Sequence, residues 1–149
     1  MSYLSCYEMQ IETLKKKYPY FKPIDINRNL CPILDQIQLK DNIKSAILSI
    51  DTSMRMQDVI QHENKDISVL SSDILSALFY HYMSIDYDAE KFNLLTHQVK
   101  VYNEQSTLLI HECNQKNVEK IKFQLTFCFV LPFICETQIK AIINQLEVQ

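Results

Sequence analysis

Histidine and cysteine are the residue types in this chain from which a metal site or a nucleophile would most readily be built. Its four histidines are His62, His81, His97 and His111. No HxxxH or HxxE spacing occurs among them, so the sequence gives no pattern of metal ligands on one helix face. Solvated or core positions are therefore expected for all four.

The cysteines also lack the spacing that redox or zinc chemistry requires. They are Cys6, Cys31, Cys113, Cys128 and Cys135, an odd set without a CxxC pair. In a reducing compartment such residues behave as small buried hydrophobes, which is the role expected here. Cys113 and His111 lie two residues apart, and this spacing points two helical side chains to different faces, which disfavours a nucleophile and base pair.

Glycine is absent from all 149 residues. Phosphate-binding loops of the Walker and Rossmann types need glycine where the backbone approaches a phosphate or takes positive φ, so neither loop can be built. Tight hairpin turns also depend on glycine. The composition therefore predicts an all-α protein, a compact bundle of about seven helices forming one domain over residues 1–149.

Charge and hydropathy exclude several classes of partner. The net charge is −3 and the basic residues are scattered, so no footprint for nucleic acid or anionic lipid is expected. The run Lys15-Lys16-Lys17 suits the C-terminal end of a helix. The first ten residues lack the apolar core of a signal peptide, and no apolar run approaches the ~18 residues of a membrane span. A cytoplasmic protein is expected.

Apolar periodicity predicts where the helices lie. They are expected at residues 2–17, from Pro32 towards Met54, and at 68–84, 89–112, 117–131 and 133–148, with a loop or short helix after Pro23, a loop within 55–66, and a kink or break at Pro132. Asp66 or Ser68 can cap the helix at 68–84, and Asp86 or Asp88 the next. Phe123, Phe127, Phe129 and Phe133 are interpreted mainly as core.

The segment at 68–84, SVLSSDILSALFYHYMS, has apolar positions almost all the way round. One stripe contains Leu70, Ile74, Ala77 and Leu78, and a neighbouring stripe contains Leu75, Phe79, Tyr82 and Met83. A helix of this kind needs cover on more than one side. The second cover is either a separate protein or, as an equal alternative, the rest of the chain's own bundle.

Residues 47–84 are similar to the middle of the trans-polyprenyl diphosphate synthases. The run Val69-Leu70-Ser71-Ser72-Asp73-Ile74-Leu75 matches that family's V-L-A-G-D-Y-L type segment. Its continuation Ser76-Ala77-Leu78-Phe79-Tyr80 resembles the S-G-L-Y-Y pattern of the small subunit of two-component bacterial synthases that make hexaprenyl or heptaprenyl diphosphate. The N-terminal LKKKYPYF is similar to the same subunit's basic helix and Pro-Tyr turn.

The sequence departs from the catalytic members where their chemistry is done. Those enzymes hold Mg²⁺ with two D-D-x-x-D clusters, but this chain has no Asp-Asp pair. Ser53-Met54-Arg55-Met56 stands where the first cluster would fall, with Asp51 and Asp58 at the wrong spacing. The Gly-Lys-Arg loop of the second substrate is also missing. No catalytic residue, metal ligand or cofactor is therefore expected on this chain, and Mg²⁺ is expected on its partner.

The resemblance implies a regulatory, non-catalytic small subunit with a truncated prenyltransferase fold. It would pair with a large subunit bearing the D-D-x-x-D motifs, which condenses farnesyl diphosphate with isopentenyl diphosphate, and would help set the length of a product used for a menaquinone side chain. Chain length in this family is limited by the depth of an apolar tunnel. The residues expected at the subunit interface or around the product's prenyl tail are Leu75, Leu78, Phe79, Tyr82, Met83, Ile50, Met54, Met56, Leu70 and Ile74.

Other interpretations stay open at this point. Each of these residues could instead be ordinary core. The chain as a whole could be an α-helical adaptor whose apolar groove binds a partner helix, with no link to isoprenoids. A self-sufficient enzyme is disfavoured by the missing carboxylate clusters and glycines.

Overall fold

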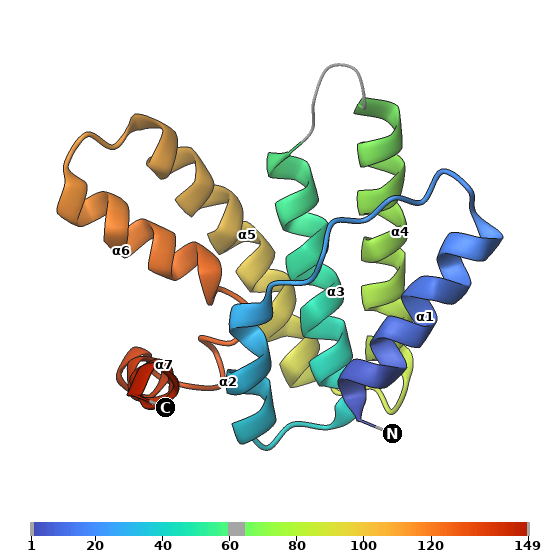
Figure 1. Cartoon of the computed structure of the whole chain (residues 1–149), viewed down its shortest axis with the longest axis horizontal. Coiled ribbons are helices and arrows are strands. Elements are labelled where there is room, and N and C mark those ends of the chain that lie inside the picture. The colour runs from blue at the N-terminus through green and yellow to red at the C-terminus, as the bar shows by residue number, and fades with distance from the viewer. Residues whose placement is uncertain (1, 60–64, 149) are drawn as a thin grey trace. The chain divides into compact units, whose positions relative to one another are not determined.

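The computed structural model describes residues 2–59 and 65–148, and this part of the chain is all-helical (Figure 1). Its elements are α1 (Tyr3–Lys17), η1 (Arg28–Leu30, a short 3₁₀ helix), α2 (Cys31–Gln36), α3 (Asp41–Asp58), α4 (Lys65–Ser84), α5 (Ala89–His111), α6 (Gln115–Thr126) and α7 (Glu136–Val148). The predicted fold class, a helical bundle of about seven helices, is confirmed.

The ends of α1 follow from local chemistry. The Ser2 hydroxyl accepts a hydrogen bond from the backbone N–H of Ser5 at 3.1 Å, which caps the helix. Three lysines occupy the last turn, where positive charge is favourable. The helix ends at Lys17, before Pro19, as the sequence predicts.

The continuous helix predicted from Pro32 towards Met54 is wrong, because the chain breaks between α2 and α3. Pro32 does lie in the first turn of a helix, but that helix ends at Gln36. Ile37 and Lys40 take extended backbone conformations, with ψ of 151° and 148°. The break contains no glycine or proline, and α3 begins without a side-chain cap, so the usual sequence signals are missing.

Other predicted ends shift by a few residues. α3 continues to Asp58 and α4 begins at Lys65, so Asp66 and Ser68 lie inside the helix that they were expected to cap. α6 ends at Thr126 and α7 begins at Glu136, which places Pro132 in the connection between them. His62 lies outside the described residues.

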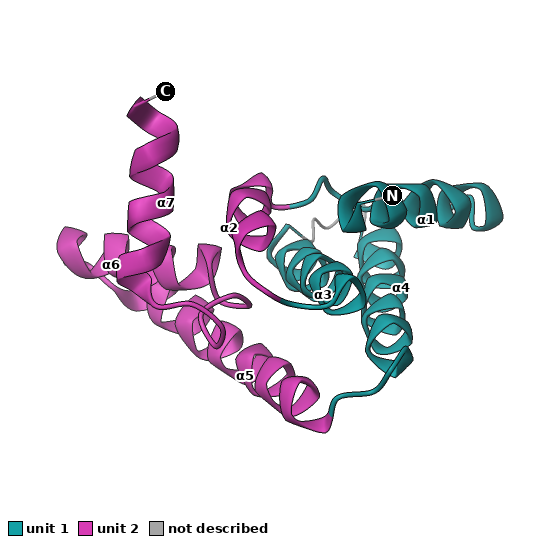
Figure 2. Ribbon diagram, turned by 90° about the horizontal axis from the view of Figure 1, so that it is seen from below, with its two compact units in different colours: residues 1–26, 39–88 teal, residues 27–38, 89–149 magenta. Residues whose placement is uncertain are grey.

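The chain divides into two compact units, shown in separate colours in Figure 2. Unit 1 comprises residues 1–26 and 39–88, which contain α1, α3 and α4. In this unit α3 and α4 run side by side in opposite directions, and α1 packs against α3 (Figure 1). The assignment of residues 1–149 to a single domain stays a prediction.

Unit 2 comprises residues 27–38 and 89–149. Within it α5 and α6 form an antiparallel hairpin, and α7 packs against α2. The Gln98 side-chain amide donates to the carbonyl of Cys128 at 2.6 Å, tying α5 to the segment after α6. Of the predicted aromatic core, Phe127 and Phe129 are buried, whereas Phe123 and Phe133 are only half-buried.

Candidate functional site

The candidate site is built on α3 and α4, which are joined by a seam of serines. The Ser49 hydroxyl donates to the carbonyl of Leu75 at 2.7 Å, and the Ser53 hydroxyl donates to the carbonyl of Ser72 at 2.9 Å. The Ser72 hydroxyl is also within hydrogen-bond reach of the Ser53 carbonyl, at 3.1 Å. Small side chains let the two backbones approach closely, and their hydroxyls are satisfied by carbonyls of the opposite helix. The seam therefore fixes which face of α4 turns inward.

The structure places most of the predicted site residues on that inward face or on α3. The buried ones are Leu75, Leu78, Phe79, Tyr82 and Met83 on α4, together with Ile50, Met54 and Met56 on α3. Ile74 is half-buried, and Leu70 is exposed. These positions describe the chain by itself, and the roles at an interface or around a prenyl tail stay predictions.

The outward face of α4 carries apolar side chains in contact with solvent. Leu70 is 42% exposed, Val69 40% and Tyr80 56%. Ala77 is exposed between them. The four positions share one face of a helix with 3.6 residues per turn, broken by Asp73. We call this set the outer α4 face. Leu70 is among the residues predicted for the interface, whereas Val69 and Tyr80 are not, although the spacing of Leu70, Ala77 and Tyr80 is a signal that could have identified them.

A groove runs along the edge of the outer α4 face, between α4 and α1. Its volume is about 270 Å³. It is lined by Gln10, Leu14 and Tyr18 from α1 and its C-terminal cap, and by Ile74, Ala77, Leu78 and His81 from α4. Apart from His81, no lining residue carries an acidic or basic side chain. The contribution from α1 was missed because nothing in the sequence says which helix packs beside α4.

Two tyrosine rings lie close together where α1 faces α4. The rings of Tyr7 on α1 and Tyr82 on α4 lie with their centroids 6.3 Å apart. Burial raises the pKa of the Tyr82 hydroxyl to about 12, and the nearby Cys6 thiol adds to the shift. Burial also raises the pKa of Tyr7 well above its ordinary value. Both hydroxyls are therefore held in the neutral form at physiological pH, where they can donate hydrogen bonds but cannot serve as bases.

The aspartate nearest the position of the family's first metal cluster is paired with an arginine. The Asp51 carboxylate is fully buried, and the Arg55 Nε donates to it at 2.9 Å. Asp58 is exposed at the end of α3. Within residues 2–59 and 65–148, no three His, Cys, Asp or Glu side chains are grouped so that they could hold a metal ion.

The burial expected of the cysteines is only partly right. Cys128 is buried, whereas Cys6, Cys113 and Cys135 are exposed. The expectation was wrong for these three because they lie on the solvent side of amphipathic helices or next to helix ends. The Cys113 thiol points to the backbone carbonyl of His111 at 4.0 Å.

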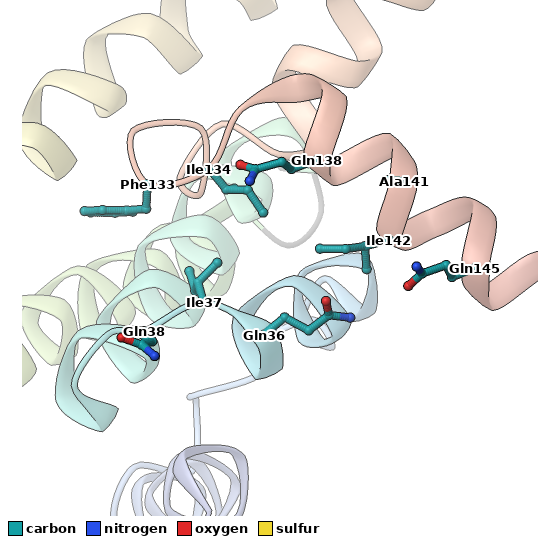
Figure 3. A pocket seen from close by; sticks show the side chains of 9 residues that line it. All are labelled: Gln36, Ile37, Gln38, Phe133, Ile134, Gln138, Ala141, Ile142 and Gln145. Atoms are coloured by element: carbon teal, nitrogen blue, oxygen red, sulfur yellow. The ribbon is translucent and has the colours of Figure 1, made fainter.

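Unit 2 contains a separate pocket of about 410 Å³ beside α2 and α7 (Figure 3). Its lining is Gln36, Ile37, Gln38, Phe133, Ile134, Gln138, Ala141, Ile142 and Gln145. The labelled side chains in Figure 3 are apolar or amide-bearing. None of these nine residues is a general acid, a general base or a nucleophile, so this lining supports no catalytic step.

The fold and the site define an all-helical protein with an apolar helix face and an adjoining groove open to solvent. None of the described helices has the length and apolar character needed to cross a membrane. Residues 1–130 match the family model described as hexaprenyl diphosphate synthase, small subunit. The chain therefore belongs to the family of small subunits of hexaprenyl diphosphate synthase.

Proposed function

We propose that this chain is the regulatory, non-catalytic subunit of a synthase whose large subunit carries the D-D-x-x-D motifs and the Mg²⁺. The family to which the chain belongs implies a large-subunit partner. In the proposed complex, the large subunit condenses farnesyl diphosphate with isopentenyl diphosphate, and this chain helps to limit the length of the product. The product would supply a menaquinone side chain.

The observation that carries the proposal is the outer α4 face. Contiguous apolar surface on a soluble protein is commonly an interaction site, and exposed tyrosines are typical of the centre of such sites. Tyr80 and Leu70 lie on this face, and the groove beside α1 continues it. A large subunit bound here would cover α4 on its second side, which the sequence pattern of this helix requires.

A role in chain length follows from the other side of α4. Leu78, Phe79 and Met83 are bulky and lie within about one and a half turns of α4. In the proposed complex Phe79 and Met83 stand behind the interface and Leu78 stands at the groove that adjoins it, where they limit how far an apolar tail can extend. The limit is steric, so smaller side chains should allow a longer product.

Reconstitution with the large subunit tests this function. Each protein is assayed alone and then mixed with farnesyl diphosphate, isopentenyl diphosphate and Mg²⁺, and the prenyl products are separated by chromatography. We expect product only from the mixture, and longer products from complexes carrying Leu78→Ala, Phe79→Ala or Met83→Ala. The control is Leu95→Ala, which removes a fully buried leucine from α5 in unit 2.

The outcomes separate the parts of the proposal. Synthesis by this chain alone would contradict a non-catalytic role, and a failure of the two wild-type proteins to associate would contradict the subunit role. Normal association and activity with unchanged product length in all three α4 variants would remove these residues from the length limit. Thermal unfolding of every variant is measured in parallel, since truncation of a buried leucine or phenylalanine costs about 2–5 kcal/mol.

A further inference from the structure

The segment that follows α1 lies across α3 and α4 in unit 1 (Figure 1). We call residues 18–26 the strap. Its central side chain, Phe21, is buried and packs with Met56 of α3 and Leu75 of α4. Partly buried side chains complete this cluster, namely Ile11, Leu14, Ile24 and Ile74. Phe21 therefore anchors the strap to both helices.

Backbone groups of the strap are held by side chains of the helices below it. The N–H of Lys22 donates to the Ser71 hydroxyl at 2.9 Å, and the N–H of Ile24 points to the Met56 sulfur at 3.2 Å. The strap thus lies in one defined position although it has no helical hydrogen bonds of its own.

Arg55 makes the most specific of these contacts. Its Nε donates to the buried Asp51 carboxylate at 2.9 Å, and its Nη2 donates to the backbone carbonyl of Asp25, also at 2.9 Å. A planar guanidinium can hold both acceptors at once because its donors point in fixed directions. A lysine has the charge but not this fork. Arg55 therefore couples a buried carboxylate of α3 to the strap.

The strap begins at the groove beside α4. Tyr18, its first residue, forms one wall of the groove opposite Ile74 and Ala77. Tyr20 is exposed. The Tyr18 N–H donates to the Leu14 carbonyl of α1 at 2.8 Å, and the Tyr18 carbonyl accepts from the Phe21 N–H at 2.9 Å. This wall is therefore tied to the strap as well as to α1.

We propose that Arg55 is a positioning residue for binding of the large subunit: it holds the strap so that Tyr18 forms the outer wall of a groove that receives apolar side chains of that partner. This inference rests on the proposed function and adds to it the residues that shape the docking surface. The groove is nearly uncharged and continues the outer α4 face, which carries Leu70 and Tyr80. A protein surface that covers both is a better match than a small ligand confined to the groove.

The first test is Arg55→Lys, which removes the forked guanidinium but keeps the positive charge. In Arg55→Lys the lysine can still pair with Asp51, but we expect the bond to the Asp25 carbonyl to be lost. Hydrogen exchange on the isolated full-length chain should then show faster exchange at the amides of Lys22 and Ile24. Affinity for the large subunit should fall about tenfold, since ordering a few strap residues must now accompany binding. Arg28→Lys, the same substitution at an exposed position of unit 2, is the matched control.

A double-mutant cycle with Tyr18→Ala separates positioning from a general loss of stability. Tyr18→Ala should also weaken binding about tenfold or more. If Arg55 acts through the wall that Tyr18 forms, Arg55→Lys should weaken binding little further when Tyr18 is already alanine. Independent effects would multiply to about a hundredfold, as expected if both substitutions merely destabilised unrelated parts of the chain.

Three results would overturn the inference while leaving the proposed function intact. They are unchanged strap exchange in Arg55→Lys, faster exchange with wild-type affinity, and multiplying losses in the double variant. Failure of the wild-type chain to bind the large subunit would instead contradict the proposed function itself.

Discussion

The two helices at the centre of unit 1, α3 and α4, differ in burial in the opposite sense to that expected from their hydropathy. α3 contains three serines, a threonine and an aspartate among its buried residues, namely Ser45, Ser49, Ser53, Thr52 and Asp51, and every residue from Ile43 to Met54 except Lys44 is buried. α4 is the more apolar helix, yet it leaves Val69, Leu70 and Tyr80 exposed. The more polar helix is therefore the more enclosed one.

This difference shows that burial depends on satisfying polar groups as well as on apolar area. The α3 hydroxyls donate to carbonyls of α1, of α3 itself or of α4, and the Asp51 carboxylate has Arg55. These partners lower the free-energy cost of burying the hydroxyls and the carboxylate of α3. The apolar residues of the outer α4 face are exposed in this chain, and in the proposed function the large subunit covers them.

The largest expected effect removes the arginine on which the enclosed helix depends. Arg55→Met leaves the Asp51 carboxylate buried without its cation, and the free energy of unfolding should fall by about 3–5 kcal/mol. Urea denaturation followed by circular dichroism measures this loss. A loss of this size would mean that α3 tolerates its buried aspartate because Arg55 pairs with it.

Two further variants make the test specific. Asp51→Asn combined with Arg55→Met removes both charges and should recover much of the lost stability. Lys140→Met breaks the exposed pair with Glu136 on α7 and should cost about 1 kcal/mol or less. A loss as small as that for Arg55→Met would contradict the comparison between α3 and α4.

The second prediction concerns the helix that is left open. Tyr80→Ser should leave the stability of the isolated chain within about 0.5 kcal/mol of wild type, because the side chain is mostly exposed. It should weaken binding of the large subunit by roughly 2 kcal/mol, as expected for a tyrosine at an interface centre. Titration calorimetry gives the affinity. Tyr87→Ser, at an equally exposed tyrosine after α4, should leave binding unchanged, and equal effects of both substitutions would argue against the outer α4 face.

Much of this architecture can be predicted from the sequence, because the spacing of apolar residues and the residues at helix ends indicate where the helices lie. The missing glycines and the apolar spacing predict an all-helical chain, and the helix expected at 89–112 is observed as α5, Ala89–His111. The break before α3 could not be predicted, since Lys40 precedes the helix without a capping side chain and no proline or glycine interrupts the apolar stripe. At this break tertiary contacts override the local helical propensity, and a local sequence pattern does not show such contacts.

The candidate site was harder to predict than the fold. The pattern identifies 68–84 as a helix with too much apolar surface for one partner, but it does not say which side faces inward. The inward side is fixed by Ser49 and Ser53 of α3, whose hydroxyls donate hydrogen bonds to carbonyls of α4. Pairings of this kind between distant segments are invisible to a periodicity argument, as are the Arg55 contact with the strap and the wall formed by Tyr18.

The smallest expected effect compares the two faces of α4 through tyrosines two residues apart. Tyr82 is 8% exposed and its pKa is raised from 10 to about 12, whereas Tyr80 lies on the solvent side. Between pH 10 and 12 the unfolded chain loses the Tyr82 proton while the folded chain keeps it. The unfolded state then binds fewer protons, so stability falls as pH rises, by about 1.4 kcal/mol per pH unit from this residue. Below pH 10 both states are protonated and this contribution does not change.

Substitution by phenylalanine assigns that slope to one side of the helix. In Tyr82→Phe the ionisable hydroxyl is gone, so unfolding free energies measured at intervals between pH 9 and 11 should decline less steeply than in wild type. In Tyr80→Phe the wild-type slope should persist, because Tyr82 and its buried hydroxyl are unchanged. Tyr7 adds a similar dependence in all three proteins, since its pKa is raised by burial as well. Identical slopes for the two phenylalanine variants would mean that both faces of α4 see the same surroundings, and the distinction between its inner and outer face would fail.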